Sequence, residues 1–438
     1  MPERLASGVL PDRLTSLLGL VTMMVLAWLL SDGRRRMNWR LIASGVALQL
    51  ALAALLLGTP LRDGLFRLVG ALMTALIACS DEGAEFVFGE DFRDHYFAFS
   101  VMPTVVFFSS LTAVLFYLGV LQWLVRVMAR VMVWVMDVSG TESLVAAVNV
   151  FVGMTTAPLA IRPYLDTMTR SELMAMMTAG MATVAGGTMV AYVGMAPDDQ
   201  TRALLAGHLA VASLISAPAA LVIAKIMVPE TEDSPTKGTV RIDVPRTDAN
   251  LLDAACRGAA EGLKLVLNIV AMLIAFIALV ALVNWLLAAL VGGLDWSLWT
   301  LGLAESPHCL LSGLLGGEPL SLQRILGWLC APLAWLMGVP WEDAHAVGVL
   351  IGEKTIFNEF IAYQSLMECK DALSPRAFTI ATYALCGFAN FGSIAVTIGG
   401  ISQLAPSRRK EFAAYGFRAM IGGSLAAFMT AAIAGMLI

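Results

Sequence analysis

The chain has 438 residues, of which 58% are hydrophobic and only 14% are charged. Soluble domains are about 45–50% apolar and about one quarter charged, so this composition excludes a water-soluble protein and requires lipid as solvent along most of the chain. The formal net charge of −5 excludes little, because orientation in a membrane depends on where the charges lie along the sequence.

Residues 1–13 lack the apolar core and cleavage site of a signal peptide, so the first hydrophobic segment is expected to remain as a membrane span. About 20 apolar residues are needed to cross the hydrocarbon core. This length predicts an amphipathic interfacial helix at about residues 62–80. It also predicts eight spans, at about 14–31, 40–58, 101–128, 172–196, 204–228, 264–293, 376–400 and 412–438.

Two other apolar stretches, 143–168 and 344–370, carry polar residues, glycine and proline in their middles, and we interpret them as re-entrant hairpins. Arginines 34 to 36 follow the first span, so the positive-inside rule predicts a cytoplasmic loop there and an N-terminus outside. If neither hairpin crosses the membrane, both termini are periplasmic or extracellular. Basic residues near later spans then also fall inside: Arg126, Arg130, Arg408, Arg409, Lys410 and Arg418.

The interrupted segments form two matching pairs. The first hairpin has the sequence GMTTAP (153–158) and precedes a span with the break GMATVAG (180–186). The second hairpin has GEKT (352–355) and NEF (358–360), and it precedes a span with the break GFANFGS (387–393). The two broken spans run in opposite directions, which is typical of inverted-repeat transporters with a midplane site. A helix broken at membrane depth leaves backbone groups that substrate, ions or polar side chains can satisfy.

Glu359 and Lys354 place charge at hairpin depth, where a charged side chain costs at least about 2.5–3.5 kcal/mol. A functional site is one explanation. The alternative is a structural ion pair between these two side chains at the tip of the hairpin.

At these residues the sequence resembles the concentrative nucleoside transporters. GEKTIFNEFIAY (352–363) is similar to the G-x-K-x-x-x-N-E-F signature of that family, and ALCGFANFGSIAV (384–396) is similar to its broken penultimate span. The segment 157–173 resembles its first hairpin and the start of the next helix. The resemblance covers about residues 95–438. It implies an all-α polytopic membrane protein with two re-entrant helical hairpins and two discontinuous transmembrane helices, assembled as a homotrimer.

The resemblance also implies the site. In the family the ribose hydroxyls are bound by residues that are here Asn358, Glu359, Asn390 and Ser393, and an aromatic residue beside the base corresponds to Phe388. Carboxylate and amide groups suit a vicinal diol, which both donates and accepts hydrogen bonds. The sodium site would use Asn149, Val152, Thr183 and Val184, with proton coupling as the alternative. The other substrate-binding residues would be Met154, Thr155, Thr156 and Thr188.

One motif departs from the family. Its first hairpin normally reads G-Q-T-E or G-Q-S-E, and the Gln and Glu contact the nucleobase. Here these positions hold Met154 and Thr156, so two strong polar contacts for a base edge are missing. Altered base selectivity, a different aglycone, or another small diol-bearing solute would each explain the change.

We therefore expect an ion-coupled symporter of the bacterial inner membrane that imports nucleosides and contacts lipid but no nucleic acid. A membrane-embedded enzyme and a channel are alternatives, although the sequence shows no nucleophile–base constellation. The five expected units are scaffold spans with the interfacial helix (1–130), a first transport repeat (131–228), a cytoplasmic linker (229–262), a long scaffold span with an external loop (263–320) and a second transport repeat (321–438).

Overall fold

The computed structural model describes residues 2–95, 101–154, 156–237, 248–301 and 320–438. Within these ranges the chain is helical apart from its turns, and it has no strand beyond an isolated bridge between Ser139 and Lys237. In the same ranges seven helices are long and apolar enough to cross a membrane, and two further bent pairs pass that test together. The expected all-α polytopic fold is confirmed.

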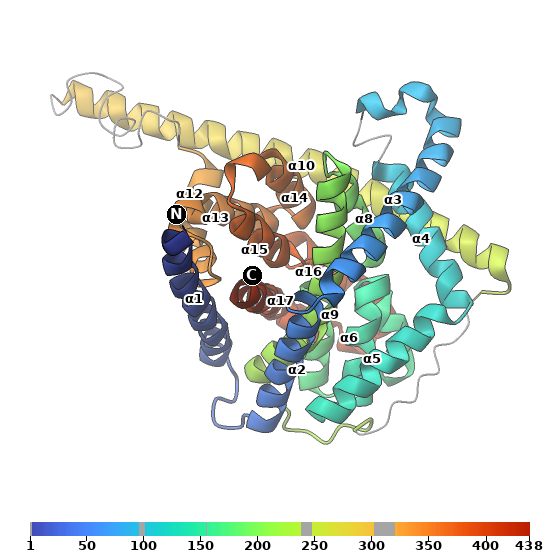
Figure 1. Cartoon of the computed structure of the whole chain (residues 1–438). Helices are drawn as coiled ribbons and strands as arrows, with labels where there is room; N and C mark the ends of the chain where they lie inside the picture. Colours follow the sequence, from blue (N-terminus) through green and yellow to red (C-terminus); the bar gives the residue numbers. More distant parts are fainter. Residues whose placement is uncertain (1, 96–100, 155, 238–247, 302–319) are drawn as a thin grey trace.

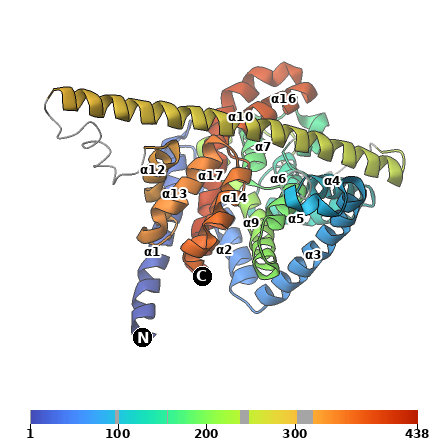
Figure 2. The same cartoon turned by 90° about the horizontal axis from the view of Figure 1, so that it is seen from above.

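One helix dominates the outline of the molecule. Helix α10 (Leu251–Thr300) has 50 residues, and it crosses the molecule and extends past the compact body at both ends in Figures 1 and 2. It packs along α4 (Met102–Tyr117). Gly258 and Gly262 allow this close approach. A Cβ atom on Gly258 would lie 2.6 Å from the Ser109 carbonyl oxygen, and one on Gly262 would lie 2.8 Å from the Ser109 Cβ. The long span predicted at 264–293 is therefore the centre of a longer helix, and part of the expected linker 229–262 is helical.

The N-terminal part contains α1 (Pro2–Leu29), α2 (Trp39–Leu57) and α3 (Leu61–Phe88). The stretch predicted to be interfacial, 62–80, belongs to α3, whose 28 residues are also long and apolar enough to span a membrane. The Phe66 ring of α3 fills the space above Gly207 of α9 (Asp199–Met227), 2.4 Å from where a Cβ would stand. The depth of α3 in the membrane stays a prediction.

The span predicted at 101–128 is not one continuous helix. Helix α4 ends at Tyr117, and α5 (Val120–Met136) leaves it at 75°. Gly119 makes the turn with φ +85°, a left-handed conformation that favours glycine. Because α5 carries Arg126 and Arg130 on an otherwise apolar helix, its polar side needs contact with water or headgroups, which a straight continuation of α4 would not give it.

The two transport repeats have the same order of elements: a hairpin, a broken helix and an unbroken helix. The breaks predicted at 180–186 and 387–393 and both hairpins are present, although the second arm of the first hairpin is a 3-10 helix. The first repeat comprises α6 (Gly140–Val152), η3 (Ala157–Tyr164), α7 (Arg170–Ala182), α8 (Gly186–Gly194) and α9. The second comprises α12 (Leu322–Leu336), α13 (Trp341–Ile356), α14 (Glu359–Glu368), α15 (Pro375–Leu385), α16 (Phe391–Leu404) and α17 (Arg409–Leu437). Short 3-10 turns lie at η1 (Glu90–His95), η4 (Lys370–Ala372) and η5 (Pro406–Arg408).

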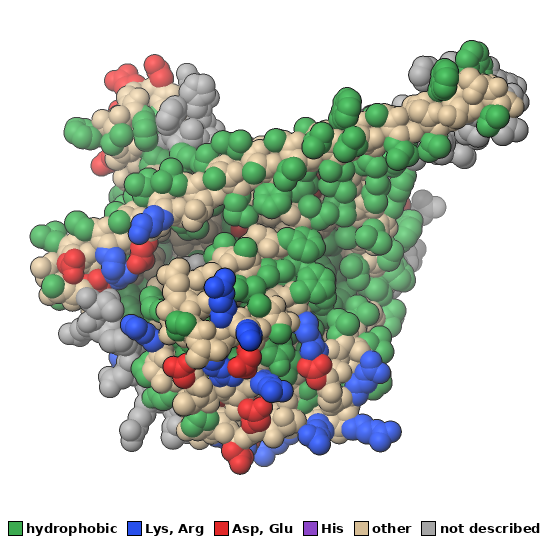
Figure 3. Space-filling model, turned by 180° about the vertical axis from the view of Figure 1, so that it is seen from behind, with side chains coloured by type: hydrophobic (Ala, Val, Ile, Leu, Met, Phe, Trp, Pro, Cys, Tyr) green, Lys and Arg blue, Asp and Glu red, His purple; other side chains and the backbone are tan. Residues whose placement is uncertain are grey.

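The repeats form the buried centre of the molecule. Of the most apolar stretch of each helix, 89% is buried in α9 and 78% in α17, but only 6% in α10. Figure 3 shows apolar side chains covering the exposed face along α10, while charged side chains gather on the lower part of that face. Apolar surface of this extent is stable only against lipid or another protein.

Contacts between distant segments mark the two ends of the molecule. At one end, Arg418 Nη1 lies 2.6 Å from Asp32 Oδ2, and Arg408 donates to the carbonyl oxygens of Leu165 and Met168. At the other end, Ser16 Oγ donates to the Met337 carbonyl oxygen at 3.0 Å. There Arg376 donates to the carbonyl oxygens of Gly435 and Ile438, both at 2.7 Å. The C-terminus thus lies at the end opposite the basic loop that follows α1.

Candidate functional site

The turn of the first hairpin lies against the first helix break. A capping box between Ser139 and Glu142 starts α6, and the helix ends at Gly153, whose φ is +87°. A Cβ on Gly153 would stand 2.9 Å from the Cβ of Ala185, which is the residue before α8. Glycine here therefore serves both the left-handed conformation and the close approach of the turn to the break.

The two helix breaks touch each other. Helix α7 ends at Ala182, and the next residue, Thr183, is extended, with φ −115° and ψ 158°. Gly387, which follows α15, has φ +136°, and a Cβ there would lie 2.8 Å and 2.9 Å from the carbonyl oxygens of Met181 and Ala182. The free carbonyls at the end of α7 and the turn of the second break therefore meet at one point inside the molecule.

Glu359 is the centre of the polar cluster beside these breaks. Its Oε1 accepts a hydrogen bond from the Tyr192 hydroxyl at 3.0 Å, and its Oε2 accepts one from Asn390 Nδ2 at 2.9 Å. Only 7% of Glu359 is exposed. A buried carboxylate needs such donors, since an unpaired one would be strongly destabilising. The structure thus brings together Glu359 and Asn390, two of the four residues expected to bind ribose.

Asn358 and Ser393, the other two expected ribose ligands, lie at the starts of α14 and α16. The Asn358 Oδ1 accepts from the Ile361 backbone N–H at 3.0 Å and caps α14, while the Asn390 Oδ1 accepts from that of Ser393 at 2.8 Å and caps α16. Asn358 and Ser393 are both buried. Helix N-termini carry a partial positive charge, so this junction favours electron-rich oxygen atoms such as those of hydroxyl groups.

Lys354 does not form the ion pair that was the alternative explanation for charge at this tip. Its fully buried ammonium group donates to the Ala384 carbonyl oxygen at 2.9 Å and lies 5.7 Å from the centre of the Phe428 ring. The lysine therefore joins the second hairpin to α15 and α17. Glu359 is bonded to Tyr192 and Asn390 instead.

Two buried tyrosines of the site were missed by sequence reasoning. Tyr192 of α8 stacks on Tyr363 of α14 with ring centres 4.5 Å apart, and the Tyr363 hydroxyl donates to the Thr382 carbonyl oxygen at 2.8 Å. Tyr192 belongs to no motif. Its position four residues after Thr188 is the only available signal, because that spacing places both side chains on one face of α8.

The residues expected to bind sodium are buried around the first break. Asn149, Thr183 and Val184 are each 1% exposed, and Val152 is half-buried. Asn149 Oδ1 has no hydrogen-bond partner among the described residues, and its Nδ2 lies 3.8 Å from where a Cβ on Gly180 of α7 would stand. Thr183 Oγ1 donates to the Ala179 carbonyl oxygen at 2.9 Å, so its lone pairs stay available. A buried oxygen without a donor fits a hard monovalent cation.

A cavity of about 240 Å³ lies between α4, α10, the first hairpin and α8. Val152, Thr156 and Thr188 line it together with the aromatic side chains of Phe116 and Phe151. Met154 and Phe388, both half-buried, are not part of its lining, and Thr155 lies outside the described residues. Nor do the four ribose-side residues line this cavity.

Met154 instead packs into the protein. Its Sδ accepts from Thr397 Oγ1 of α16 at 3.5 Å, and its Cβ is 2.8 Å from where a Cβ on Gly180 would stand. The thioether therefore closes the contact between the first hairpin, α7 and α16. A polar group at this position would lie within reach of the same hydroxyl.

Charged residues line one wall of the cavity. Arg257 of α10 contacts Asp248 at 2.6 Å and Glu261 at 2.9 Å, and Arg162 of the first hairpin lines the same cavity. The hydrogen bond from Arg257 lowers the pKa of Asp248, which precedes α10. Charged groups of the first hairpin and of α10 thus face the same space.

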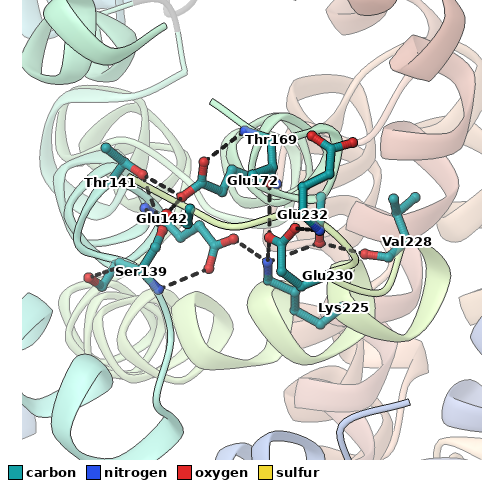
Figure 4. A network of polar contacts seen from close by, with 12 residues as sticks. Ser139, Thr141, Glu142, Thr169, Glu172, Lys225, Val228, Glu230 and Glu232 are labelled. Atoms are coloured by element: carbon teal, nitrogen blue, oxygen red, sulfur yellow. Dashed lines mark hydrogen bonds and ion pairs between the residues drawn. The ribbon is translucent and has the colours of Figure 1, made fainter. Parts of the chain in front are cut away.

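A second polar network lies at the basic end of the molecule (Figure 4). Lys225 of α9 forms ion pairs with the fully buried Glu142 of α6 and, at 3.0 Å, with Glu230 of the linker. Glu172 of α7 accepts from Thr141 at 3.1 Å and from Ser234 at 2.5 Å. The network therefore ties the first hairpin, the start of α7, the end of α9 and the start of the linker together.

Comparison with known proteins identifies this arrangement. Three family models match successive parts of the chain: "Na+ dependent nucleoside transporter N-terminus" over residues 18–91, "Nucleoside recognition" (gate) over 98–198, and "Na+ dependent nucleoside transporter C-terminus" over 208–435. Solute carrier family 28 member 3 of Rattus norvegicus is 41% identical, and the match covers 97% of this chain but 59% of the rat protein. The chain thus spans about three fifths of the length of that relative.

Two shorter relatives match over their whole length. The uncharacterized transporter YutK of Bacillus subtilis is 38% identical over 97% of this chain and 99% of its own. The structure of CNTnw in an inward-facing substrate-bound state is 39% identical, with a TM-score of 0.84 over 97% of this chain and 98% of CNTnw. These relatives are transporters, which confirms the expectation of a transporter rather than an enzyme. With a C-terminal model matching 228 of 438 residues and a full-length bacterial relative at 38% identity, the chain belongs to the concentrative nucleoside transporter family.

Proposed function

We propose that this chain imports nucleosides by sodium-coupled symport with alternating access. The observation that carries the proposal is the buried Glu359 carboxylate, held by Tyr192 and Asn390 where the α14 and α16 N-termini meet. A vicinal diol could exchange hydrogen bonds with this carboxylate and with the amides of Asn358 and Asn390. The ribose of a nucleoside presents such a diol.

Sodium coupling is supported by the first helix break. Asn149 Oδ1 is buried without a partner, and Thr183 has acceptor capacity beside the free carbonyls that end α7. Asn149, Thr183 and the backbone oxygens of Val152 and Val184 would hold the ion. Bound sodium would supply positive charge to the break and so link closure of the first hairpin to substrate binding.

Base selectivity is proposed to differ from that of relatives with the G-Q-T-E motif. Thr156 and Thr188 line the cavity on the base side and offer hydroxyl groups, whereas Met154 turns into the protein and bonds to Thr397. A pair of hydroxyls discriminates between base edges less strongly than a bidentate amide and a carboxylate.

The mobile unit comprises both hairpins with α7–α9 and α15–α17, and the scaffold comprises α1–α4 and α10. The exposed apolar face of α10 would serve as the contact of a homotrimer, with lipid covering the rest. The basic end would be cytoplasmic and both termini periplasmic, in a bacterial inner membrane.

Uptake of labelled uridine into proteoliposomes under an inward sodium gradient tests the function. Glu359→Gln should reduce the initial rate at low uridine by roughly 10- to 150-fold, because a charge-assisted hydrogen bond is worth about 1.5–3 kcal/mol. Glu368→Gln is the matched control on the same helix, since Glu368 is exposed and contacts Gln364. It should transport like the parent chain.

Tyr192→Phe tests the hydrogen bond that holds the Glu359 carboxylate. It removes the donor to Glu359 Oε1 but leaves the ring stacked on Tyr363, so a loss of about 2- to 10-fold is expected. Wild-type uptake by Glu359→Gln would contradict the ribose assignment. Uptake of another diol-bearing solute, with none of any nucleoside, would identify a different substrate class.

A further inference from the structure

A pocket of about 630 Å³ at the basic end of the molecule is not used by the proposed substrate and sodium sites. This volume is typical of small-molecule binding sites. The pocket lies between the α1–α2 loop, the start of α7, the start of the linker and α17. The loop and the linker touch, since a Cβ on Gly33 would stand 3.5 Å from Pro229 Cγ. The charged side chains of the lining are Asp32, Arg34, Arg35, Arg36, Arg170, Glu230 and Glu232.

Two of the three carboxylates in this lining are held by basic groups that lie outside it. Asp32 Oδ2 is 2.6 Å from Arg418 Nη1, and Glu230 Oε2 is 3.0 Å from Lys225 Nζ. Glu232, which is labelled with Glu230 in Figure 4, forms no ion pair with the described part of the chain. Four arginines therefore face one unpaired carboxylate, and the pocket favours an anion.

Three of the four arginines have unoccupied guanidinium groups. The side chains of Arg35, Arg36 and Arg170 form no hydrogen bond or ion pair with any residue that the structure describes. The nearest attraction for Arg170 is to Glu411, whose carboxylate already binds Arg408 at 2.6 Å. Each guanidinium group offers five N–H donors in a planar fork that matches two oxygen atoms of a phosphate group.

An exposed apolar stripe leads away from the pocket along α1. At its start, Arg34 Nη2 donates to the Leu29 carbonyl oxygen at 2.6 Å, and the Arg34 guanidinium lies 5.6 Å from the centre of the Trp28 ring. From Trp28 the stripe continues at spacings of three and four residues, which place its members on one helix face: Val25, Val21, Leu18, Leu17 and Leu14. Helix α1 lies on the outside of the molecule in Figure 1. Tryptophan at the end of such a stripe is typical of the headgroup level of a membrane.

A phosphate group attached to an acyl chain fits the pocket and the stripe together. A soluble phosphate would leave the stripe unused, and a zwitterionic lipid would bring its ammonium group close to the arginines. Basic pockets between membrane helices on the cytoplasmic side suit anionic headgroups. We propose that this pocket binds the headgroup phosphate of an anionic phospholipid, with an acyl chain along the α1 stripe. The site goes beyond the proposed transport function and does not depend on it.

Binding of fluorescently labelled phosphatidylglycerol to the full chain in nonionic detergent micelles tests this site, with labelled phosphatidylcholine for comparison. The parent chain should bind phosphatidylglycerol more tightly. Arg35→Gln combined with Arg36→Gln should weaken that binding by roughly 5- to 25-fold, or about fivefold for each arginine, and leave phosphatidylcholine binding unchanged.

Arg126→Gln combined with Arg130→Gln is the matched control. It removes the same charge from α5, where both arginines are exposed and lie outside the pocket. This variant should bind both lipids like the parent chain. An equal loss of phosphatidylglycerol binding in the control would indicate attraction to diffuse surface charge and would overturn the proposal.

Equal affinity of the parent chain for the two lipids would also overturn it. Displacement of the label by millimolar inorganic phosphate would identify a soluble anion as the ligand and contradict the lipid assignment. Arg35 and Arg36 are exposed, so their variant should fold, which its melting temperature without added lipid checks. The two-lipid comparison on the parent chain needs no variant, and none of these measurements requires nucleoside uptake.

Discussion

Removing one oxygen atom at Thr183 would separate ion binding from substrate binding. Thr183→Val keeps the branched shape but removes Oγ1, so we expect roughly a 2- to 10-fold higher sodium concentration for half-maximal uptake. At saturating sodium the uridine affinity should stay close to that of the parent chain. Sodium titrations of initial uptake rates measure both quantities.

Thr178→Val is the control for that substitution. Thr178 lies on the same helix, is fully buried, and its hydroxyl has no partner in the described part of the chain. Its removal should leave the sodium dependence unchanged. Equal sodium curves for Thr183→Val and Thr178→Val would remove Thr183 from the ion site.

Substitution of Met154 tests the proposed change in base selectivity. Met154→Gln nearly conserves side-chain volume and places an amide where Thr397 Oγ1 now contacts the thioether. An added neutral hydrogen bond to a base would favour that nucleoside by about 0.5–1.5 kcal/mol, or roughly 2- to 10-fold in competition assays with uridine and adenosine. Unchanged competition by every base would show that residue 154 does not contact the nucleobase.

Met154→Gln combined with Thr156→Glu restores the motif of the family. The added carboxylate would lie in the same unit as the buried Glu359, and repulsion between like charges could hide a gain in affinity. The double variant is therefore compared with Met154→Gln alone. A selectivity change in the single variant with loss of uptake in the double one would indicate this repulsion.

At the level of the element, the contact between the two helix breaks is the most sensitive point. Gly387→Ala would place a Cβ in a conformation with φ +136° and within 3 Å of two α7 carbonyl oxygens. A loss of about 1–3 kcal/mol in stability is expected, read as a lower melting temperature in detergent. Gly399→Ala on α16 is the control, because a Cβ there meets nothing within 4 Å. It should melt at or above the temperature of the parent chain.

The sequence predicted the elements whose ends are marked by polar residues. Glycine and asparagine at 153, 186, 358, 387 and 390 located both hairpins and both breaks, because these residues cap or turn helices inside an apolar segment. The bend at Gly119 was missed, since a lone glycine in a long apolar run is more often a packing position. The start of α10 at Leu251 was also missed, because the charges before residue 264 resemble a loop.

The candidate site shows the same limit. Asn358 and Glu359 could be identified because they form a motif, and the structure bonds Glu359 to Asn390 as expected for one site. Tyr192 could not be identified, because its partnership with Glu359 joins residues 167 positions apart through tertiary packing alone.

At the scale of the whole molecule, the network around Lys225 joins α6, α7, α9 and the linker. Lys225→Met would leave the carboxylate of Glu142 buried without its cation, so a loss of about 3–5 kcal/mol in stability is expected. Adding Glu142→Gln to that variant should restore most of the melting temperature, because it removes the unpaired charge. Lys370→Met breaks an exposed pair with Asp198 and should change stability by at most about 1 kcal/mol. A parent-like melting temperature for Lys225→Met would show that the network adds no stability.

The linker that this network holds also limits how far the transporter can move. Its start is fixed to the mobile unit, where the Gly140 N–H donates to the Thr236 carbonyl oxygen at 3.0 Å. Its far end is fixed to the scaffold, where Asp248 pairs with Arg257 of α10. Twelve peptide units join Thr236 to Asp248, so these two anchor points can separate by at most roughly 40–43 Å, the length of the fully extended chain. In the proposed mechanism this tether length is an upper bound on the stroke of each transport cycle.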